Sequence, residues 1–158
     1  MDYIFKEFIP GNAAKLDGVV ISGNWAGQRA IGMEGALTGI EETIAFLKHY
    51  NIKTVIIGQT ERYTVPYPVV MARNYMYGTN NNTFYLDGYT QKMNAFLNAN
   101  LKGTYINVLN QAAFPPLSNS GEPYMRDKDH ATKYGADLIV EKLKKDPVWR
   151  RFLGDKAQ

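Results

Sequence analysis

"GVVIS" at residues 18–22 and "KTVIIG" at residues 53–58 are short β-branched runs that end at a glycine. Runs of this kind are typical of buried strands in a parallel sheet. Between them, apolar residues recur at spacings of three and four from residue 37 to residue 47, which predicts an amphipathic helix. Asn51 stands where a left-handed residue would end that helix. This part of the chain therefore predicts a strand-helix-strand unit.

The rest of the chain continues the alternation of strands and helices. We expect a Tyr- and Pro-rich loop at "TVPYPVV" (64–70), an exposed turn at "GTNNNT" (78–83), a helix over 87–101, a strand at "TYINVL" (104–109) and a final helix from about Thr132. Thr132 is the N-cap candidate of this last helix, whose inward positions are Tyr134, Leu138, Ile139 and Leu143. The pattern predicts a three-layer α/β sandwich with a mainly parallel sheet, in one domain over residues 1–158.

Composition limits the classes of function. The 158 residues are 45% hydrophobic and 21% charged, which is ordinary for one globular domain. The net charge of +3 comes without a block of Lys or Arg, so nothing indicates a nucleic-acid partner. The absence of cysteine excludes disulfides and leaves the compartment open. No apolar run reaches the roughly 18 residues of a membrane span.

Three polar segments follow the expected strands and should meet at one edge of the sheet. "SGNWAG" (22–27) follows the first strand, "GQTERY" (58–63) follows the second, and the chain after the third leads to "RDKDH" (126–130). In open α/β sheets, ligands bind beyond the carboxyl ends of the strands. We therefore expect a site where these loops converge.

Asp127 and His130, spaced as D-x-x-H before the last helix, are the candidate acid-base pair. A histidine that acts as general base needs its far nitrogen fixed by a carboxylate, which sets the tautomer and stabilises the imidazolium. From the spacing alone, His130 is equally explained as a surface histidine at a helix start. Asp129, between them, is expected to point to solvent or to cap the helix. The other histidine, His49, lies near a helix end, where a positive charge is merely favourable.

Four segments together resemble a known family. "GVVISGNWAG" (18–27), residues 42–74, "YINVL" (105–109) and "EPYMRDKDHATKYGADLI" (122–139) are similar, in order and spacing, to the later part of the SGNH hydrolase-like domain. The most similar version is the one attached to membrane acyltransferases of the acyltransferase-three family, which modify cell-surface polysaccharides. The resemblance runs from about Asp17 to Leu143 and implies a flavodoxin-like α/β fold at the extracytoplasmic face of the cell envelope.

The resemblance also implies roles for individual residues. Asp127 and His130 match the Asp and His of a Ser-His-Asp mechanism, and Asn24 matches an oxyanion-hole asparagine. Asn24 is equally natural as a turn residue beside glycine. Trp25 is a candidate to line the substrate pocket or to pack in the core. For Arg62 and Tyr63, in the loop after the second strand, substrate contact and plain solvation stay open.

The family's nucleophile has no counterpart in this sequence. SGNH enzymes carry a serine in a Gly-Asp-Ser block, whereas Ser22, Ser118 and Ser120 follow no Gly-Asp pair, and the family's glycine donor block is missing too. We assign no nucleophile and expect these 158 residues to be the C-terminal part of a longer domain, with an incomplete sheet that favours self-association. The partners expected are the missing N-terminal segment and a membrane acyltransferase domain.

Three functions follow from these observations. The first is part of a serine esterase or carbohydrate O-acyltransferase acting on an acylated carbohydrate, inactive as this chain stands. The second is a non-catalytic carbohydrate-binding or interaction module, which the 11 tyrosines would suit. The third, a metal site at Asp127, Asp129 and His130, is disfavoured because no distant fourth ligand is evident. We therefore expect neither metal nor cofactor.

Overall fold

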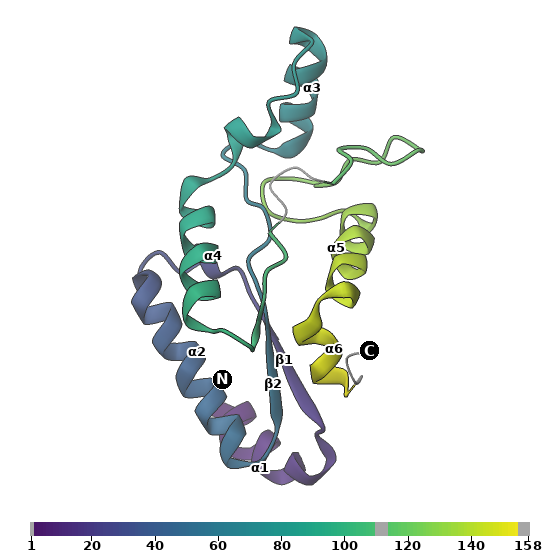
Figure 1. The fold of residues 1–158 in the computed structure, drawn as a ribbon. Coiled ribbons are helices and arrows are strands. Elements are labelled where there is room, and N and C mark those ends of the chain that lie inside the picture. The colour runs from purple at the N-terminus through teal and green to yellow at the C-terminus, as the bar shows by residue number, and fades with distance from the viewer. Residues whose placement is uncertain (1, 110–113, 155–158) are drawn as a thin grey trace.

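A parallel sheet of three strands forms the centre of the computed structural model, which describes residues 2–109 and 114–154 (Figure 1). The strands are β1 (Gly18–Ser22), β2 (Lys53–Ile57) and β3 (Tyr105–Ile106), in the order β1-β2-β3. β1 pairs in parallel with β2 over its full length, from Gly18 opposite Lys53 to Ser22 opposite Ile57. The expected mainly parallel α/β fold is confirmed.

The first crossover is the strand-helix-strand unit that the sequence predicts. α2 (Gly32–His49) joins β1 to β2, and its buried residues include Leu37, Ile40 and Leu47. Asn51 has φ 58°, and the amide of Ile52 donates to the carbonyl of Leu47. Asparagine tolerates the left-handed conformation better than most residues, so it ends α2 at little cost.

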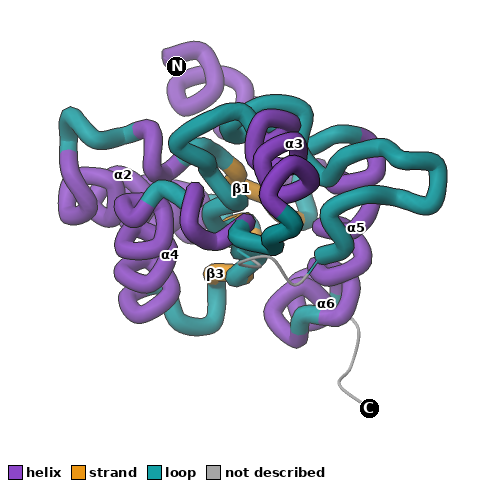
Figure 2. The backbone as a smooth tube through the Cα atoms, turned by 90° about the horizontal axis from the view of Figure 1, so that it is seen from above, coloured by secondary structure: helices purple, strands orange, loops and turns teal. Residues whose placement is uncertain are grey.

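Helices cover both faces of the sheet, which gives three layers (Figures 1 and 2). α2 and α4 (Gly88–Asn100) pack against one face, around Ile56 of β2. α5 (Lys133–Lys145) and α6 (Pro147–Leu153) pack against the other, around Val55. Neighbouring residues of a strand point to opposite faces, so two successive fully buried residues serve both layers. Each contributes about 1.5–3 kcal/mol through burial of its side chain.

The N-terminal segment is helical, which the sequence pattern did not predict. It consists of η1 (Ile4–Phe8), α1 (Ile9–Asn12) and the 3₁₀ turn η2 (Ala13–Lys15). Ile9 is buried with Leu47 and Ile52 at the end of α2. One buried contact therefore attaches this segment to the first crossover.

The expected loop at residues 64–70 is wrong in its second half, because α3 (Tyr67–Tyr77) begins there. Pro66 is the N-cap residue and a second proline lies in the first turn of α3. Proline fixes φ near the helical value and lacks an N–H that the first turn would leave unbonded, so prolines here start a helix. The expected turn at 78–83 is present, but Asn82, the first residue of the 3₁₀ turn η4 (Asn82–Tyr85), is buried.

β3 is shorter than the strand expected over 104–109. The side chain of Asn107 accepts a hydrogen bond from the amide of Leu109 at 3.1 Å, which turns the backbone away from the sheet ladder. Val108 and Leu109 nevertheless stay buried. The expected loop that follows passes through residues 110–113, which lie outside the described residues.

The outer edge of β1 is open in the described part of the chain. β1 has β2 as its one strand neighbour, and the side chain of Val20 is 46% exposed. An apolar pocket of about 240 Å³ lies beside it, lined by Ile21, Trp25 and the first half of α2. The open edge agrees with the expected incompleteness of the sheet.

Candidate active site

The loop before α5 carries the candidate acid-base residues at the carboxyl end of the sheet. A single antiparallel bridge between Met125 and Ala131 closes this loop, and the amide of Arg126 donates to the carbonyl of His130 at 2.8 Å. Thr132 caps α5 as expected, since its hydroxyl accepts from the amide of Gly135 at 3.2 Å. The loop is therefore short and held at both ends.

The imidazole of His130 lies against the carboxylate of Asp127. Its Nδ1 is 2.9 Å from Oδ2 and 3.0 Å from Oδ1 of Asp127. Because an ionised carboxylate only accepts hydrogen bonds, this contact places a proton on Nδ1 and leaves Nε2 as the proton acceptor. The side chain of His130 is 75% exposed, so a substrate can reach it from solvent. The hydrogen-bond contact expected from the D-x-x-H spacing is present.

Asp127 is held ionised by its own loop. Its Oδ1 accepts hydrogen bonds from the amides of Asp129 at 3.0 Å and His130 at 2.9 Å. These two amides, followed by the His130 side chain, lower the pKa of Asp127 from 3.8 to about 2. The carboxylate that orients the imidazole therefore stays charged over the whole range in which a histidine base works.

The expectation for Asp129 is wrong, because its carboxylate neither points to solvent nor caps α5. One oxygen lies 3.2 Å from Nδ1 of His130, and the other accepts from Nδ2 of Asn24 at 3.4 Å. Asp127 already binds the nearby amides and Thr132 already caps the helix, so Asp129 turns inward. It brings the loop after β1 and the loop before α5 together.

Asn24 combines the two roles that its sequence position left open. Its Oδ1 accepts from the amide of Gly27 at 3.0 Å, which caps the 3₁₀ turn η3 (Trp25–Gly27). With the oxygen used in this way, the amide group Nδ2 faces the Asp129–His130 cluster. An amide nitrogen carries two hydrogens, so one remains for a further acceptor.

Trp25 and Gln59 fix this loop to the end of β2. The indole Nε1 of Trp25 donates to the carbonyl of Ile57 at 2.9 Å, and the half-buried ring packs beside α2 and α4. The amide of Ala26 donates to Oε1 of Gln59 at 2.8 Å. Trp25 thus packs and also lines the small pocket beside β1, so both of its readings have support.

A buried polar chain behind Gln59 was missed by sequence reasoning. The hydroxyl of Tyr105 accepts from the amide of Gln59 at 3.1 Å and donates to Asn94 at 2.8 Å. Burial raises the pKa of Tyr105 to about 12, which keeps this hydroxyl protonated. A side chain at Gly58 would meet the carbonyl of Ile106 at 2.5 Å, so only glycine allows this approach of β2 to β3.

Tyr124 anchors the acid-base loop to the segment after β2. Its hydroxyl donates to Glu61 at 2.6 Å, and both side chains are buried. Burial, together with the charge of Glu61, raises the pKa of Tyr124 well above its usual range. The carbonyls of Asp127 and Lys128 also accept hydrogen bonds from the amides of Tyr67 and Tyr63. This anchor was not visible in the sequence, since Glu61 and Tyr124 are 63 positions apart.

Tyr63 is buried, so the expectation of solvation or direct substrate contact is wrong for its side chain. It packs with Tyr67 at 4.9 Å between ring centroids, because the segment after β2 is covered by α3 and the acid-base loop. Arg62 is half-buried, and its carbonyl accepts from the amide of Asp87 at 2.7 Å. A substrate contact by Arg62 stays a prediction.

The serines occupy positions apart from this pair. Ser22 is exposed at the end of β1, whereas Ser118 and Ser120 hydrogen-bond to each other at 2.9 Å. Within residues 2–109 and 114–154, none of them hydrogen-bonds to His130. Ligand atoms of Asp127, Asp129 and His130 lie within 4.8 Å of one another, but hydrogen bonds within the loop account for this spacing.

The fold and the site define an α/β domain with an acid-base loop at the carboxyl end of a parallel sheet. The chain belongs to the family of SGNH domains fused to acyltransferase-three (AT3) domains, whose model matches residues 4–145. It is thus a domain of an O-acyltransferase-related class. No curated protein matches the sequence significantly.

A solved structure shares the fold. It is the periplasmic domain of a lipopolysaccharide acetyltransferase from Salmonella ser. Paratyphi A, with a TM-score of 0.69 and 15% sequence identity. The match covers 86% of this chain and 59% of that chain. Among the helices of the described residues, none has the length and apolar character needed to cross a membrane.

Proposed function

We propose that this chain supplies the acid-base and oxyanion groups of an SGNH-type site that transfers or hydrolyses an acyl ester on a carbohydrate. The observation that carries the proposal is the contact of His130 Nδ1 with Asp127, which leaves Nε2 facing solvent beside Asn24. In this proposal His130 is the base, Asp127 orients it and Asn24 stabilises the oxyanion.

The proposed reaction uses these atoms in sequence. Nε2 of His130 accepts the proton of an attacking serine hydroxyl as its oxygen bonds to the acyl carbon. Negative charge develops on the former carbonyl oxygen, toward which the remaining N–H of Asn24 is directed. One such donor is worth roughly 3–4 kcal/mol in the transition state. The imidazolium, stabilised by Asp127, then returns the proton to the departing sugar oxygen.

The nucleophile in this proposal belongs to a segment outside these 158 residues. Two observations support that: Ser22, Ser118 and Ser120 make no hydrogen bond to His130, and the outer edge of β1 is open beside an apolar pocket. A strand added to that edge would end next to Asn24, because parallel strands end at the same side of a sheet. Its following loop would then reach His130.

The proposed setting is extracytoplasmic, with a membrane acyltransferase domain as partner and a cell-surface glycan as substrate. The fusion of family members to AT3 domains supports the partner. The structural likeness to a periplasmic domain of a lipopolysaccharide acetyltransferase supports the compartment and the substrate class. The noncatalytic binding module is the alternative that the following experiment separates from this proposal.

Labelling with a fluorophosphonate probe, read by intact mass and peptide mapping, tests the proposal. We expect little or no adduct on the 158-residue chain. The complete gene product should form one adduct, on a serine outside this chain, and Asp127→Asn should slow its formation because the imidazole loses its preferred tautomer. A complete gene product that forms no adduct would favour the binding module.

A further inference from the structure

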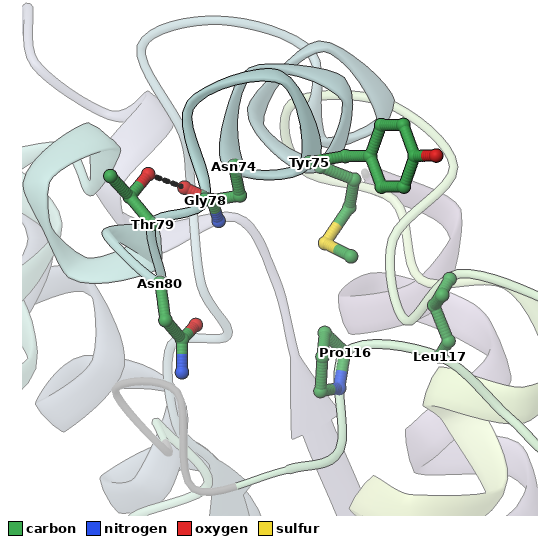
Figure 3. A pocket seen from close by; sticks show the side chains of 8 residues that line it. Asn74, Tyr75, Gly78, Thr79, Asn80, Pro116 and Leu117 are labelled. Carbon is green, nitrogen blue, oxygen red and sulfur yellow. Dashed lines mark hydrogen bonds between the residues drawn. The ribbon is translucent and has the colours of Figure 1, made fainter.

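An open pocket of about 600 Å³ lies between the end of α3 and the segment before the acid-base loop (Figure 3). Tyr75, Thr79 and Asn80 line it from α3 and the following turn, and Pro116 and Leu117 line it from the opposite side. Its volume lies within the usual range for sites that bind small molecules. None of the functions assigned above uses this pocket.

The α3 side of the pocket is rigidly built. Asn74, which is buried, donates to Asn82 at 2.7 Å and accepts from the Thr79 hydroxyl and the Asn81 amide at 3.1 Å each. Gly78 takes the left-handed conformation, with φ 60°, that turns the chain out of the helix. The buried asparagine thus holds the turn that presents Thr79 and Asn80 to solvent.

The chemistry of the lining fits an uncharged sugar. None of the described residues that line the pocket is charged, although 21% of the whole sequence is. The Tyr75 side chain is 92% exposed, which offers an apolar ring face with a polar tip. Thr79 and Asn80 are exposed and add a hydroxyl and an amide, which can donate to and accept from sugar hydroxyls. A phosphate or carboxylate would find no countercharge here.

Both walls of the pocket lead to the acid-base loop. The carbonyl of Pro116 accepts from the amide of Tyr124 at 2.9 Å, and Leu117 pairs with Pro123. At its other end α3 begins at Tyr67, whose amide donates to the carbonyl of Asp127 at 3.1 Å. Along α3 the pocket is about 10 Å from that contact, so an extended glycan can reach both places.

We propose that this pocket binds a neutral sugar unit of the glycan that the acid-base site modifies. The link to a modified glycan rests on the proposed function, whereas sugar binding in the pocket does not. Tyr75 stacks on one face of the sugar ring, and Asn80 binds its hydroxyls. The pocket would thereby hold the glycan in register while another of its units lies at His130.

Nuclear magnetic resonance tests this on the 158-residue chain, with methyl glycosides of glucose, galactose, mannose and rhamnose as probes at millimolar concentration. At least one glycoside should shift the side-chain amide signals of Asn80 and receive saturation from the Tyr75 ring. Tyr75→Ala should weaken that binding about tenfold, through loss of ring contact. Tyr77→Ala is the matched control, since Tyr77 is 72% exposed on the same helix but does not line the pocket.

Each remaining outcome has a defined meaning. If His130→Ala leaves the shifts unchanged, the binding is independent of the acid-base pair, and a failure of the catalytic proposal would not remove it. If no glycoside shifts Asn80, or if Tyr75→Ala binds as well as the unaltered chain, the proposal is wrong. Tyr75-dependent binding to phospholipid vesicles in place of sugars would assign the surface to lipid and would also overturn it.

Discussion

Asp127 is the residue whose charge state the structure defines best. Backbone amides of its own loop, more than the imidazole, lower its pKa to about 2. A carboxylate with a lowered pKa stabilises the fold above its unfolded pKa of 3.8, and this contribution disappears as the pH falls toward 2. The loop therefore prepares the orienting charge before any substrate binds.

A titration of the Asp127 carboxyl carbon by nuclear magnetic resonance should give a midpoint near 2. His130→Ala should leave most of the lowering in place, because the two amide bonds come from the backbone. Asp127→Asn should lower the free energy of unfolding at neutral pH, and that difference should vanish below about pH 2. A midpoint close to 3.8 in the unaltered chain would show that the amide bonds do not form.

Tyr124→Phe should reduce the free energy of unfolding by about 1–3 kcal/mol, since it leaves the buried Glu61 without this hydrogen-bond donor. Urea denaturation measures the change. Tyr75→Phe removes a hydroxyl from a side chain that is 92% exposed and should have no measurable effect. Equal stability of the two variants would argue against the Glu61–Tyr124 anchor.

At the scale of residues, the sequence indicates the local contacts and misses the distant ones. The Asp127–His130 pair follows from a spacing of three within one loop. The Asn24–Asp129 contact joins positions 105 apart, and no local pattern announces it. For the same reason, the burial of Tyr63 could be known only from the elements that cover it.

At the scale of elements, α5 depends on one close approach to the acid-base loop. A Cβ atom at Gly135 would lie 2.1 Å from the carbonyl oxygen of Tyr124. That carbonyl also accepts from the amide of Thr132 at 3.1 Å. The first turn of α5 therefore presses directly on the backbone that leads to His130.

Gly135→Ala should destabilise the domain by about 1–3 kcal/mol, because the methyl group forces α5 away from Tyr124. Gly39→Ala is the control in α2, where an added Cβ meets nothing within 4 Å. It should stabilise the domain by about 0.5–1 kcal/mol, since alanine favours a helix more than glycine does. Thermal unfolding of both variants measures the two signs, and a stabilising effect of Gly135→Ala would contradict the packing described here.

Elements with a regular apolar period are predictable from this sequence, whereas those set by single polar contacts are not. α2, α4 and α5 follow the expected helical patterns. α3 was missed because its prolines can begin a helix as well as interrupt one. β3 ends early because of the Asn107 side chain, a choice that apolar patterning does not record.

At the scale of the whole molecule, the three layers bring loops from two strand ends and the start of α5 to one edge of the sheet. The sequence predicts this convergence because parallel strands place their carboxyl ends together. The N-terminal helices at residues 4–15 and the pocket beside α3 were not predicted, since both depend on packing between distant segments. The open edge of β1 adds the place where a further strand would complete the site.

The central claim is that His130 is the base of an acyl-transfer site, and esterase turnover of an aryl acetate by the complete gene product tests it most directly. His130→Ala should lower the turnover rate by roughly two to four orders of magnitude, the usual loss for a general base. His49→Ala, which changes the other histidine at the end of α2, should leave the rate unchanged. A His130→Ala variant that keeps the rate of the unaltered protein would contradict the account.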